Sequence, residues 1–335
     1  MWKEKFEEMF FPVDPKKLEI EKALELKYKH IPNSLYKYKS FSSNNLEILN
    51  NDIIYLSDPK KFNDPYDCSL NMIANDLAKK AFKKNLKSMI ARMDRESKFT
   101  NEDIMFLDQT ENLSYDLSRL YAEKYPIETI DGSYVDPDEY GKISSQIIDK
   151  EFSNIYLDLM ERWNKKENIF ITCFSEIYDS ILMWSHYANN HEGFCIEYNF
   201  TNPGIHPITT NLLFPVYYQE NLFDASKFVE HMIINTPEQN RSINVEFNIN
   251  MNIYAAIVKA KEWEYEKEWR YVFPYIISQD PMILRVPEPK AIYLGAKISN
   301  KNKNKAIEIA ETRNFEVHQM ELDSSKFSLN STQII

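Results

Sequence analysis

The segment WEYEKEWR, residues 263–270, carries the sharpest candidate for chemistry in the chain. Residues 263–275 have the pattern of a helix end that passes into a strand. Read as a strand throughout, residues 263–270 place three glutamates and Arg270 on one side, because successive side chains point to opposite faces. Carboxylates two positions apart, such as those of Glu266 and Glu268, then lie about 7 Å apart and raise each other's pKa where water is excluded. Arg270 draws Glu268 back toward its ionised form. A catalytic glutamate therefore competes with a buried Arg–Glu pair that only stabilises the fold.

A second candidate spans residues 170–198, which are predicted to form a strand, a short helix and a second strand. The first strand runs into Ser175, and helical spacing places Trp184 and Tyr187 on one face. His186 points elsewhere. It is either a partly buried residue with ordinary partners or a ligand-binding or acid–base group, because an imidazole titrates near neutrality.

The loop KFNDPYD, residues 61–67, adds polar groups. Pro65 holds Asp64 in an extended conformation, and the short polar side chains here bond the local backbone. A turn at the end of a strand would explain this composition. The functional alternative is that Asn63, Asp64 and Asp67 point into a pocket, because loops presented by a sheet often carry ligands.

The strand LYKYKS, residues 35–40, is predicted to lie beside that pocket. Alternation gives it an aromatic face with Tyr36 and Tyr38 and a second face with Lys37 and Lys39. We expect Asn63, Asp64, His186, Tyr187 and Glu268 to converge on one cleft with an aromatic wall of Tyr38 and Trp184.

Composition excludes several classes of protein. The chain has 335 residues but five glycines, and neither G-x-G-x-x-G nor G-x-x-x-x-G-K-[ST] occurs, which disfavours a glycine-rich phosphate loop. The net charge of −11 argues against bulk non-specific binding to nucleic acid. Three cysteines without C-x-x-C spacing, and histidines at 186 and 191, give no metal-ligand pattern, so no metal is expected. No apolar run or leader suggests a membrane, and a cytoplasmic location is predicted.

The elements that must position these residues alternate between strand and helix patterns. The predicted class is α+β, with a mixed, mostly antiparallel central sheet, flanking helices and a large helical insertion. Residues 1–30 are predicted to be a helical arm and 31–325 a single domain, interrupted by the insertion at 71–165. Residues 326–335 are predicted to be a tail. Residues 291–322 have strand–helix–strand form, as in a crossover between parallel strands.

Several segments in this order resemble a bacterial family described as domain of unknown function 2971. They are LYKYKS, IYLSDPKKFNDPYDC, CFSEIYDSILMWSHYANNHEGFCIEY, WEYEKEWRYVF and AIYLGAKIS, and they extend from about residue 33 to residue 322. The arm and the helical insertion lie outside the shared pattern. The resemblance implies no established activity, and it suggests a link with abortive responses to phage.

The chain is more distantly similar to NAD-dependent ADP-ribosyltransferases, in which a first strand bears Arg or His, a middle strand Ser or Tyr, and a late strand E-x-E. The corresponding residues would be Lys37 or Lys39, then Ser175 or Tyr187, then Glu266 and Glu268. In that superfamily the last glutamate polarises the nicotinamide ribose as the glycosidic bond breaks, which the resemblance assigns here to Glu268. The chain departs from the pattern in offering lysine on the first strand and in lacking Thr-Ser after Ser175.

Three functions follow as hypotheses. The first is an enzyme of ADP-ribosyl transfer or NAD hydrolysis in phage defence, with NAD as substrate and Glu266 and Glu268 as catalytic residues. The residues expected to bind substrate are Lys37, Tyr38, Asn63, Asp64, Ser175, Trp184, His186, Tyr187 and Arg270. The second is a non-catalytic sensor whose aromatic pocket recognises a small molecule or a macromolecular partner. The third, a metal-dependent nuclease, is weaker because residues 266–268 read E-x-E where many nucleases have E-x-K.

Overall fold

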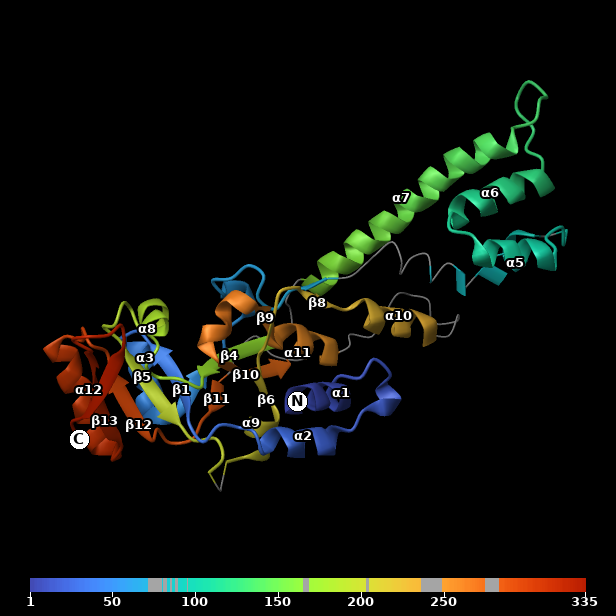
Figure 1. Ribbon diagram of the computed structural model, residues 1–335. Coiled ribbons are helices and arrows are strands. Elements are labelled where there is room, and N and C mark those ends of the chain that lie inside the picture. The colour runs from blue at the N-terminus through green and yellow to red at the C-terminus, as the bar shows by residue number, and fades with distance from the viewer. Residues whose placement is uncertain are drawn as a thin grey trace. The chain divides into compact units, whose positions relative to one another are not determined.

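The centre of the fold is an eight-stranded sheet with strand order β14-β13-β12-β5-β1-β4-β10-β6 (Figure 1). In that order the strands are Leu329–Gln333, Glu316–Leu322, Ala291–Leu294, Phe194–Tyr198, Leu35–Lys39, Ile169–Ser175, Glu268–Pro274 and Leu213–Pro215. Neighbouring strands are antiparallel except β12 and β13, which are parallel. The predicted class, α+β with a mostly antiparallel mixed sheet, is confirmed.

The computed structural model describes residues 1–71, 96–164, 169–202, 205–235, 249–274 and 283–335, together with positions 80, 83, 84, 86, 87 and 90–94. These residues form two units. The first comprises residues 1–69, 166–223 and 248–335 and holds the central sheet, and the second comprises residues 70–165 and 224–247.

The crossover at the end of the chain forms as its pattern predicts. Helix α12, Asn300–Arg313, connects β12 to β13, and the Ser299 side chain accepts from the Asn302 backbone N–H to cap it. Ala306 and Ala310 of this helix are fully buried in the hydrophobic core. Residues 326–335, predicted to be a tail, contain β14, which pairs with β13 along five residues.

Strands β4 and β5 are joined by α8, Ile181–Tyr187, in agreement with the strand–helix–strand prediction for residues 170–198. They are not neighbours in the sheet, because β1 lies between them and pairs with both. A strand from near the start of the chain therefore separates the two strands of this unit.

Each face of the sheet has its own core. One face packs strand residues such as Phe174 and Ile196 against α3, Ser43–Asn51, and α12. Leu46 and Leu49 are buried there, and the Ser42 side chain caps α3 by accepting from the Asn45 backbone N–H. The other face carries a smaller cluster around Tyr38 and Trp184.

Further helices and short strand pairs complete the first unit. The N-terminal helices α1, Trp2–Phe10, and α2, Ile20–Tyr28, contact the β6 edge, where Phe10 packs on Phe214 with 5.5 Å between ring centroids. The other elements are η1 (Pro15–Lys17), η2 (Pro59–Lys61), α9 (Pro207–Asn211), α11 (Ile249–Ile257) and η4 (Lys261–Glu266), with the pairs β2 (Ile53–Tyr55) with β11 (Ile283–Arg285) and β7 (Tyr217–Gln219) with β9 (Val258–Ala260).

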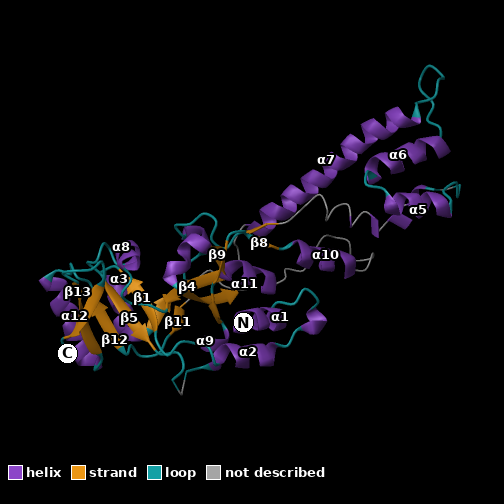
Figure 2. Cartoon of the chain, viewed as in Figure 1, coloured by secondary structure: helices purple, strands orange, loops and turns teal. Residues whose placement is uncertain are grey.

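The second unit is helical in its main elements, as Figure 2 shows. They are α5 (Asn101–Gln109), α6 (Leu113–Lys124), α7 (Pro137–Asn164) and α10 (Ser226–Asn235). Leu107, Leu113 and Leu117 are buried in a shared cluster. Residues 72–79 of the predicted insertion lie outside the described residues. Among the helices that are described, none combines the length and the apolar character needed to cross a membrane.

Candidate functional site

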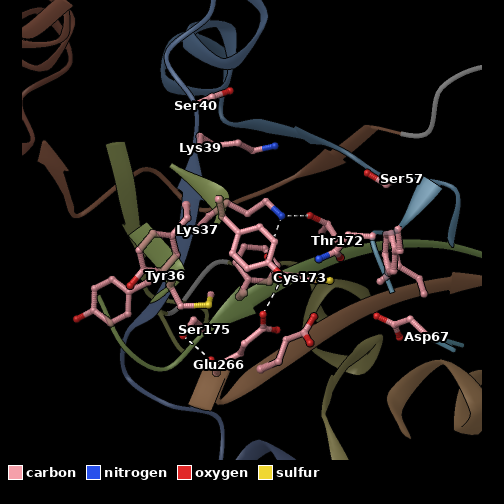
Figure 3. Close-up of a pocket in the computed structure, with 18 of the residues that line it drawn as sticks. Tyr36, Lys37, Lys39, Ser40, Ser57, Asp67, Thr172, Cys173, Ser175 and Glu266 are labelled. Carbon is pink, nitrogen blue, oxygen red and sulfur yellow. Dashed lines mark hydrogen bonds between the residues drawn. The ribbon is translucent and has the colours of Figure 1, made fainter. Parts of the chain in front are cut away.

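The site is a cavity at the place where strands β1 and β4 part. Strand β1 pairs with β5 at all five of its residues, but the described register pairs it with β4 at Tyr36 and Ser175 alone. Strand β4 in turn pairs with β10 along seven residues. Beyond the Tyr36–Ser175 pair the two strands diverge, and a cavity of about 330 Å³ opens between them (Figure 3). This volume is at the lower end of the range for small-molecule sites.

Lys37 spans the divergence. Its Nζ donates to the Thr172 Oγ1 at 2.7 Å and to the Cys173 carbonyl oxygen at 2.8 Å, so a side chain from β1 replaces the missing backbone pairing. Burial lowers the pKa of Lys37, because taking an ammonium group out of water disfavours its charged form. On the cavity wall, Ser57 pairs with Ile171 of β4 through two backbone hydrogen bonds of 2.8 and 2.9 Å.

The loop that follows η2 forms another wall. Asn63 and Asp67 line the cavity, as predicted from the KFNDPYD segment. Asp64 does not line it. Its Oδ1 accepts from the Tyr66 backbone N–H at 2.8 Å, and its Oδ2 accepts from the Trp263 Nε1 at 2.9 Å, so Asp64 holds the turn and ties it to η4.

Arg270 lies behind the cavity, fully buried, and organises the acidic wall. Its Nη1 and Nη2 donate to the two carboxylate oxygens of Asp67 at 2.6 and 2.9 Å. Its Nε and Nη2 donate to Glu268 at 3.0 Å each, and Nη1 also donates to the Ala256 carbonyl oxygen. Although burial opposes its ionisation, Arg270 and the nearby Lys259 lower the pKa of Glu268 to about 2.

Lys259 joins the two glutamates of the E-x-E segment. Its Nζ donates to Glu268 at 3.0 Å and also to Glu266. Burial disfavours the charged ammonium, but the attraction of Glu268 and Glu266 outweighs it and raises the pKa of Lys259 above its ordinary value. Lys259 is therefore a fixed cation between two carboxylates.

Glu266 is paired with one cation, Lys259, whereas Glu268 is paired with both Lys259 and Arg270. Its Oε1 accepts from the Tyr187 hydroxyl at 2.7 Å, and its backbone carbonyl accepts from the Ser175 Oγ at 2.6 Å. Burial raises the pKa of Glu266, and Glu268 acts in the same direction against the opposing effect of Lys259. Glu266 is thus a stronger base than an ordinary glutamate, whereas Glu268 is held ionised.

Of the two readings of this segment, the helix end that passes into a strand is confirmed, and the continuous strand over residues 263–270 is wrong. Residues 261–266 are the 3-10 helix η4, and β10 starts at Glu268. Lys267 between them has φ 43° and ψ 57°, a left-handed conformation that interrupts strand alternation. The two glutamates come together through Lys259, not through a shared strand face.

Some of the predicted site residues line the cavity and others do not. The predicted residues that line it are Lys37, Tyr38, Asn63, Ser175, Tyr187, Glu266 and Glu268. Within the described chain, four others lie outside the lining, namely Asp64, Trp184, His186 and Arg270. The predicted convergence therefore holds for Asn63, Tyr187 and Glu268 but not for Asp64 and His186.

Trp184 and His186 have other surroundings. Trp184 is fully buried, donates from Nε1 to the Tyr178 carbonyl oxygen at 2.7 Å, and packs edge-on against Tyr38, which does line the cavity. It supports the aromatic wall from behind. His186 is exposed, with its ring centroid 6.5 Å from that of Trp263, because it lies on the outward side of α8.

Lys259 was not predicted. It follows an apolar run, residues 253–258, and falls outside the E-x-E segment. A lysine directly after such a run is a signal for a buried cation, which must find acidic partners. Among the described residues, no group of three or more histidine, cysteine, aspartate or glutamate side chains is arranged to hold a metal ion.

Comparison with known proteins adds one match. Residues 183–271 match a family model described as "Protein of unknown function (DUF2971)". The matched segment runs from α8 to β10 and includes Tyr187, Lys259, Glu266 and Glu268 of the cavity wall. No curated protein and no solved structure matches the chain. The comparisons support the likeness to this family and give no support to the likeness to ADP-ribosyltransferases.

Proposed function

We propose that the protein breaks an N-glycosidic bond in a nucleotide, with NAD as the substrate to test first. The observation that carries the proposal is the position of Glu266, a buried carboxylate on the wall of a small cavity, held between the Tyr187 hydroxyl and the Lys259 ammonium group. Breaking a glycosidic bond passes through an oxocarbenium-like sugar, which a fixed carboxylate stabilises.

The reaction needs one base and one carboxylate, and Glu266 can serve as both. The bond between the sugar C1′ and the nicotinamide nitrogen breaks, and the electron pair leaves with nicotinamide, which becomes neutral. The oxygen of water or of an acceptor hydroxyl bonds to C1′, and its proton passes to the Glu266 carboxylate. A base with a raised pKa suits this step, because proton transfer is efficient when the pKa of the base approaches the working pH.

The surrounding groups orient Glu266. The Ser175 hydroxyl holds its backbone, Tyr187 holds one carboxylate oxygen, and Lys259 holds the other. Within the described chain, Glu268 and Arg270 form no hydrogen bond or ion pair with the Glu266 carboxylate themselves. Glu268 fixes the Lys259 ammonium group, and Arg270 fixes the loop at Asp67. This assigns the catalytic role to Glu266 and makes Glu268 a positioning residue, a change from the role that the superfamily resemblance gave to Glu268.

Water as acceptor makes the reaction NAD hydrolysis, and a hydroxyl or other nucleophile on a macromolecule makes it ADP-ribosyl transfer. Either would harm a cell that produces an unregulated form of the enzyme. That outcome suits an abortive response to phage, in which an infected cell stops growing.

The test is the release of nicotinamide from NAD by the purified full-length protein, with Glu266→Gln as the variant. We expect Glu266→Gln to lower the rate by about 10²–10⁴-fold while the protein stays folded. A purified protein that leaves NAD intact both alone and with cell extract as a source of acceptor would refute the proposal.

A second candidate is binding without catalysis, and one observation favours it. Glu266 and Glu268 are both engaged by protein partners, so the polar wall is complete without a substrate. Such a pocket can serve as a sensor for a small molecule or a macromolecular partner. In that case NAD or a fragment of it would bind by calorimetry, and no product would form over hours.

A further inference from the structure

The side of the cavity away from the acidic wall carries the two lysines of β1. Lys39, the last residue of that strand, lines the cavity together with Lys37, Ser40 and Ser57. Figure 3 shows the Lys39 side chain extending from β1 toward the side of the cavity that carries Ser57. Within the described part of the chain, the Lys39 ammonium group has no hydrogen bond or ion pair.

Neither lysine forms a salt bridge within the described part of the chain. Lys37 donates to neutral oxygens, those of the Thr172 hydroxyl and the Cys173 carbonyl. The acids on the facing wall, Asp67, Glu266 and Glu268, are bound by Arg270 and Lys259. These three carboxylates face two cations of their own, so one negative charge remains on that wall to balance Lys37, and the charge of Lys39 is left without a counter-charge.

Uncompensated positive charge in a cavity costs free energy unless a ligand compensates it. Burial and the neighbouring charge of Lys37 lower the pKa of Lys39 to about 7, so Lys39 is near half protonation at neutral pH. An anion that enters the cavity returns Lys39 to its charged form and gains an ion pair shielded from water. In a chain with a net charge of −11, this local surplus of positive charge stands out.

We infer that the Lys37–Lys39 end of the cavity binds a phosphate group of the substrate. This inference rests on the proposed function and deepens it, because it assigns the phosphate of the proposed nucleotide substrate to the β1 lysines. The hydroxyl groups of Ser40 and Ser57 and the amide of Asn63 line the same cavity and supply neutral donors for the remaining phosphate oxygens. The sugar then lies between this end and Glu266.

The experiment compares AMP with adenosine as probes, because the two differ by one phosphate group and neither contains the nicotinamide–ribose bond whose cleavage in NAD is proposed. Binding to the full-length protein is measured by calorimetry at pH 6.5 and pH 8.5. We expect AMP to bind at least about 10-fold more tightly than adenosine, which corresponds to about 1.4 kcal/mol. We also expect the affinity for AMP, and not that for adenosine, to fall at the higher pH as Lys39 loses its proton.

Substitutions at Lys39 test its role in binding the phosphate group. Lys39→Gln should weaken AMP binding by about 10-fold or more and leave adenosine binding unchanged, because charge-assisted contacts to phosphate are lost. Lys39→Arg keeps the charge and should retain most of the affinity. Lys301→Gln, at an exposed lysine on α12, is the matched control and should behave like the wild type. Thermal unfolding verifies that each variant is folded.

Equal affinity for AMP and adenosine would overturn the inference, as would no binding of AMP at millimolar concentration. An equal loss of affinity for AMP and for adenosine in a folded Lys39→Gln variant would also overturn the inference. The same experiments distinguish failure of the phosphate site from failure of the proposed function. AMP binding with the expected pattern but no cleavage of NAD would leave the phosphate site standing and remove the reaction, whereas cleavage of NAD with an unchanged KM in Lys39→Gln would do the reverse.

Discussion

Arg270 and Asp67 form a two-point ion pair, with Nη1–Oδ1 2.6 Å and Nη2–Oδ2 2.9 Å, although 203 positions separate them in the chain. Both side chains are buried. The pair anchors the loop that lines the cavity to β10, so the wall of the site depends on a contact inside the core.

Removal of Arg270 should therefore destabilise the fold strongly. Arg270→Met leaves the carboxylates of Asp67 and Glu268 buried without their main partner, and we expect a loss of about 3–5 kcal/mol in the free energy of unfolding. Urea unfolding measures this loss. The control is Arg313→Met, which breaks a half-exposed pair with Asp52 and should cost at most about 1 kcal/mol. Similar losses in the two variants would contradict the role of Arg270.

Glu268 should make the stability of the folded protein depend on pH in the acidic range. Its pKa is lowered to about 2 in the folded protein from an ordinary 4.5, so folding favours the ionised form. The stabilisation is present above pH 4.5 and disappears as pH falls toward about 2, because the unfolded chain takes up the proton first. Glu268→Gln should be less stable than the wild type at pH 7 and should lose less stability between pH 5 and pH 3. A parallel dependence in both proteins would contradict the assignment.

Lys39 should make stability rise with pH in a second, higher window. Its folded pKa of about 7 lies below the ordinary 10.5, so the unfolded chain holds the proton between these values and stability rises with pH across that window. Lys39→Met removes the buried charge and should raise the melting temperature by a few degrees at pH 6, with a smaller difference at pH 9. Differential scanning calorimetry without ligand measures both. An effect that is the same at the two pH values would show that the charge of Lys39 is not buried.

Glu266 and Tyr187 should affect the rate of the proposed reaction in different degrees. Tyr187→Phe removes one hydrogen bond to the Glu266 carboxylate, worth about 1.5–3 kcal/mol because the acceptor is charged, and should slow the reaction less than Glu266→Gln does. The acidic limb of kcat/KM should lie above the ordinary glutamate value of 4.5, because burial raises the pKa of Glu266. An unchanged pH profile in a slow Tyr187→Phe variant would indicate that Tyr187 acts on folding alone.

Gly193 should tolerate no side chain. A Cβ placed there would lie 2.1 Å from the Lys39 carbonyl oxygen and 2.9 Å from that of Ala188, both backbone atoms. Gly193→Ala should cost about 1–3 kcal/mol, because the end of β1 must move. Since that movement shifts Lys39, the variant should also weaken AMP binding. A variant as stable as the wild type would show that β1 can shift freely at this end.

Local pattern was enough to predict many elements of this protein. Alternation indicated the strand at 35–39, and the strand–helix–strand pattern indicated the crossover at 291–322, because these signals depend on neighbours within a few positions. The same local chemistry pointed to Lys37, Tyr187 and the two glutamates. The strand expected at 263–270 failed for the same reason, because period-two spacing does not show that Lys267 adopts a left-handed conformation.

The sequence alone thus determined which segments are strands and helices and which of them carry charged groups. The tertiary structure alone decided that β1 lies between β4 and β5, that β1 and β4 part after Tyr36 and Ser175, and that Lys259 joins Glu266 to Glu268. These relationships bring together segments as far apart as Tyr36 and Ser175, which pair across 139 positions of the chain, and no local pattern encodes them. They arise because each buried charge must find a partner, and only the folded chain determines which partner is within reach.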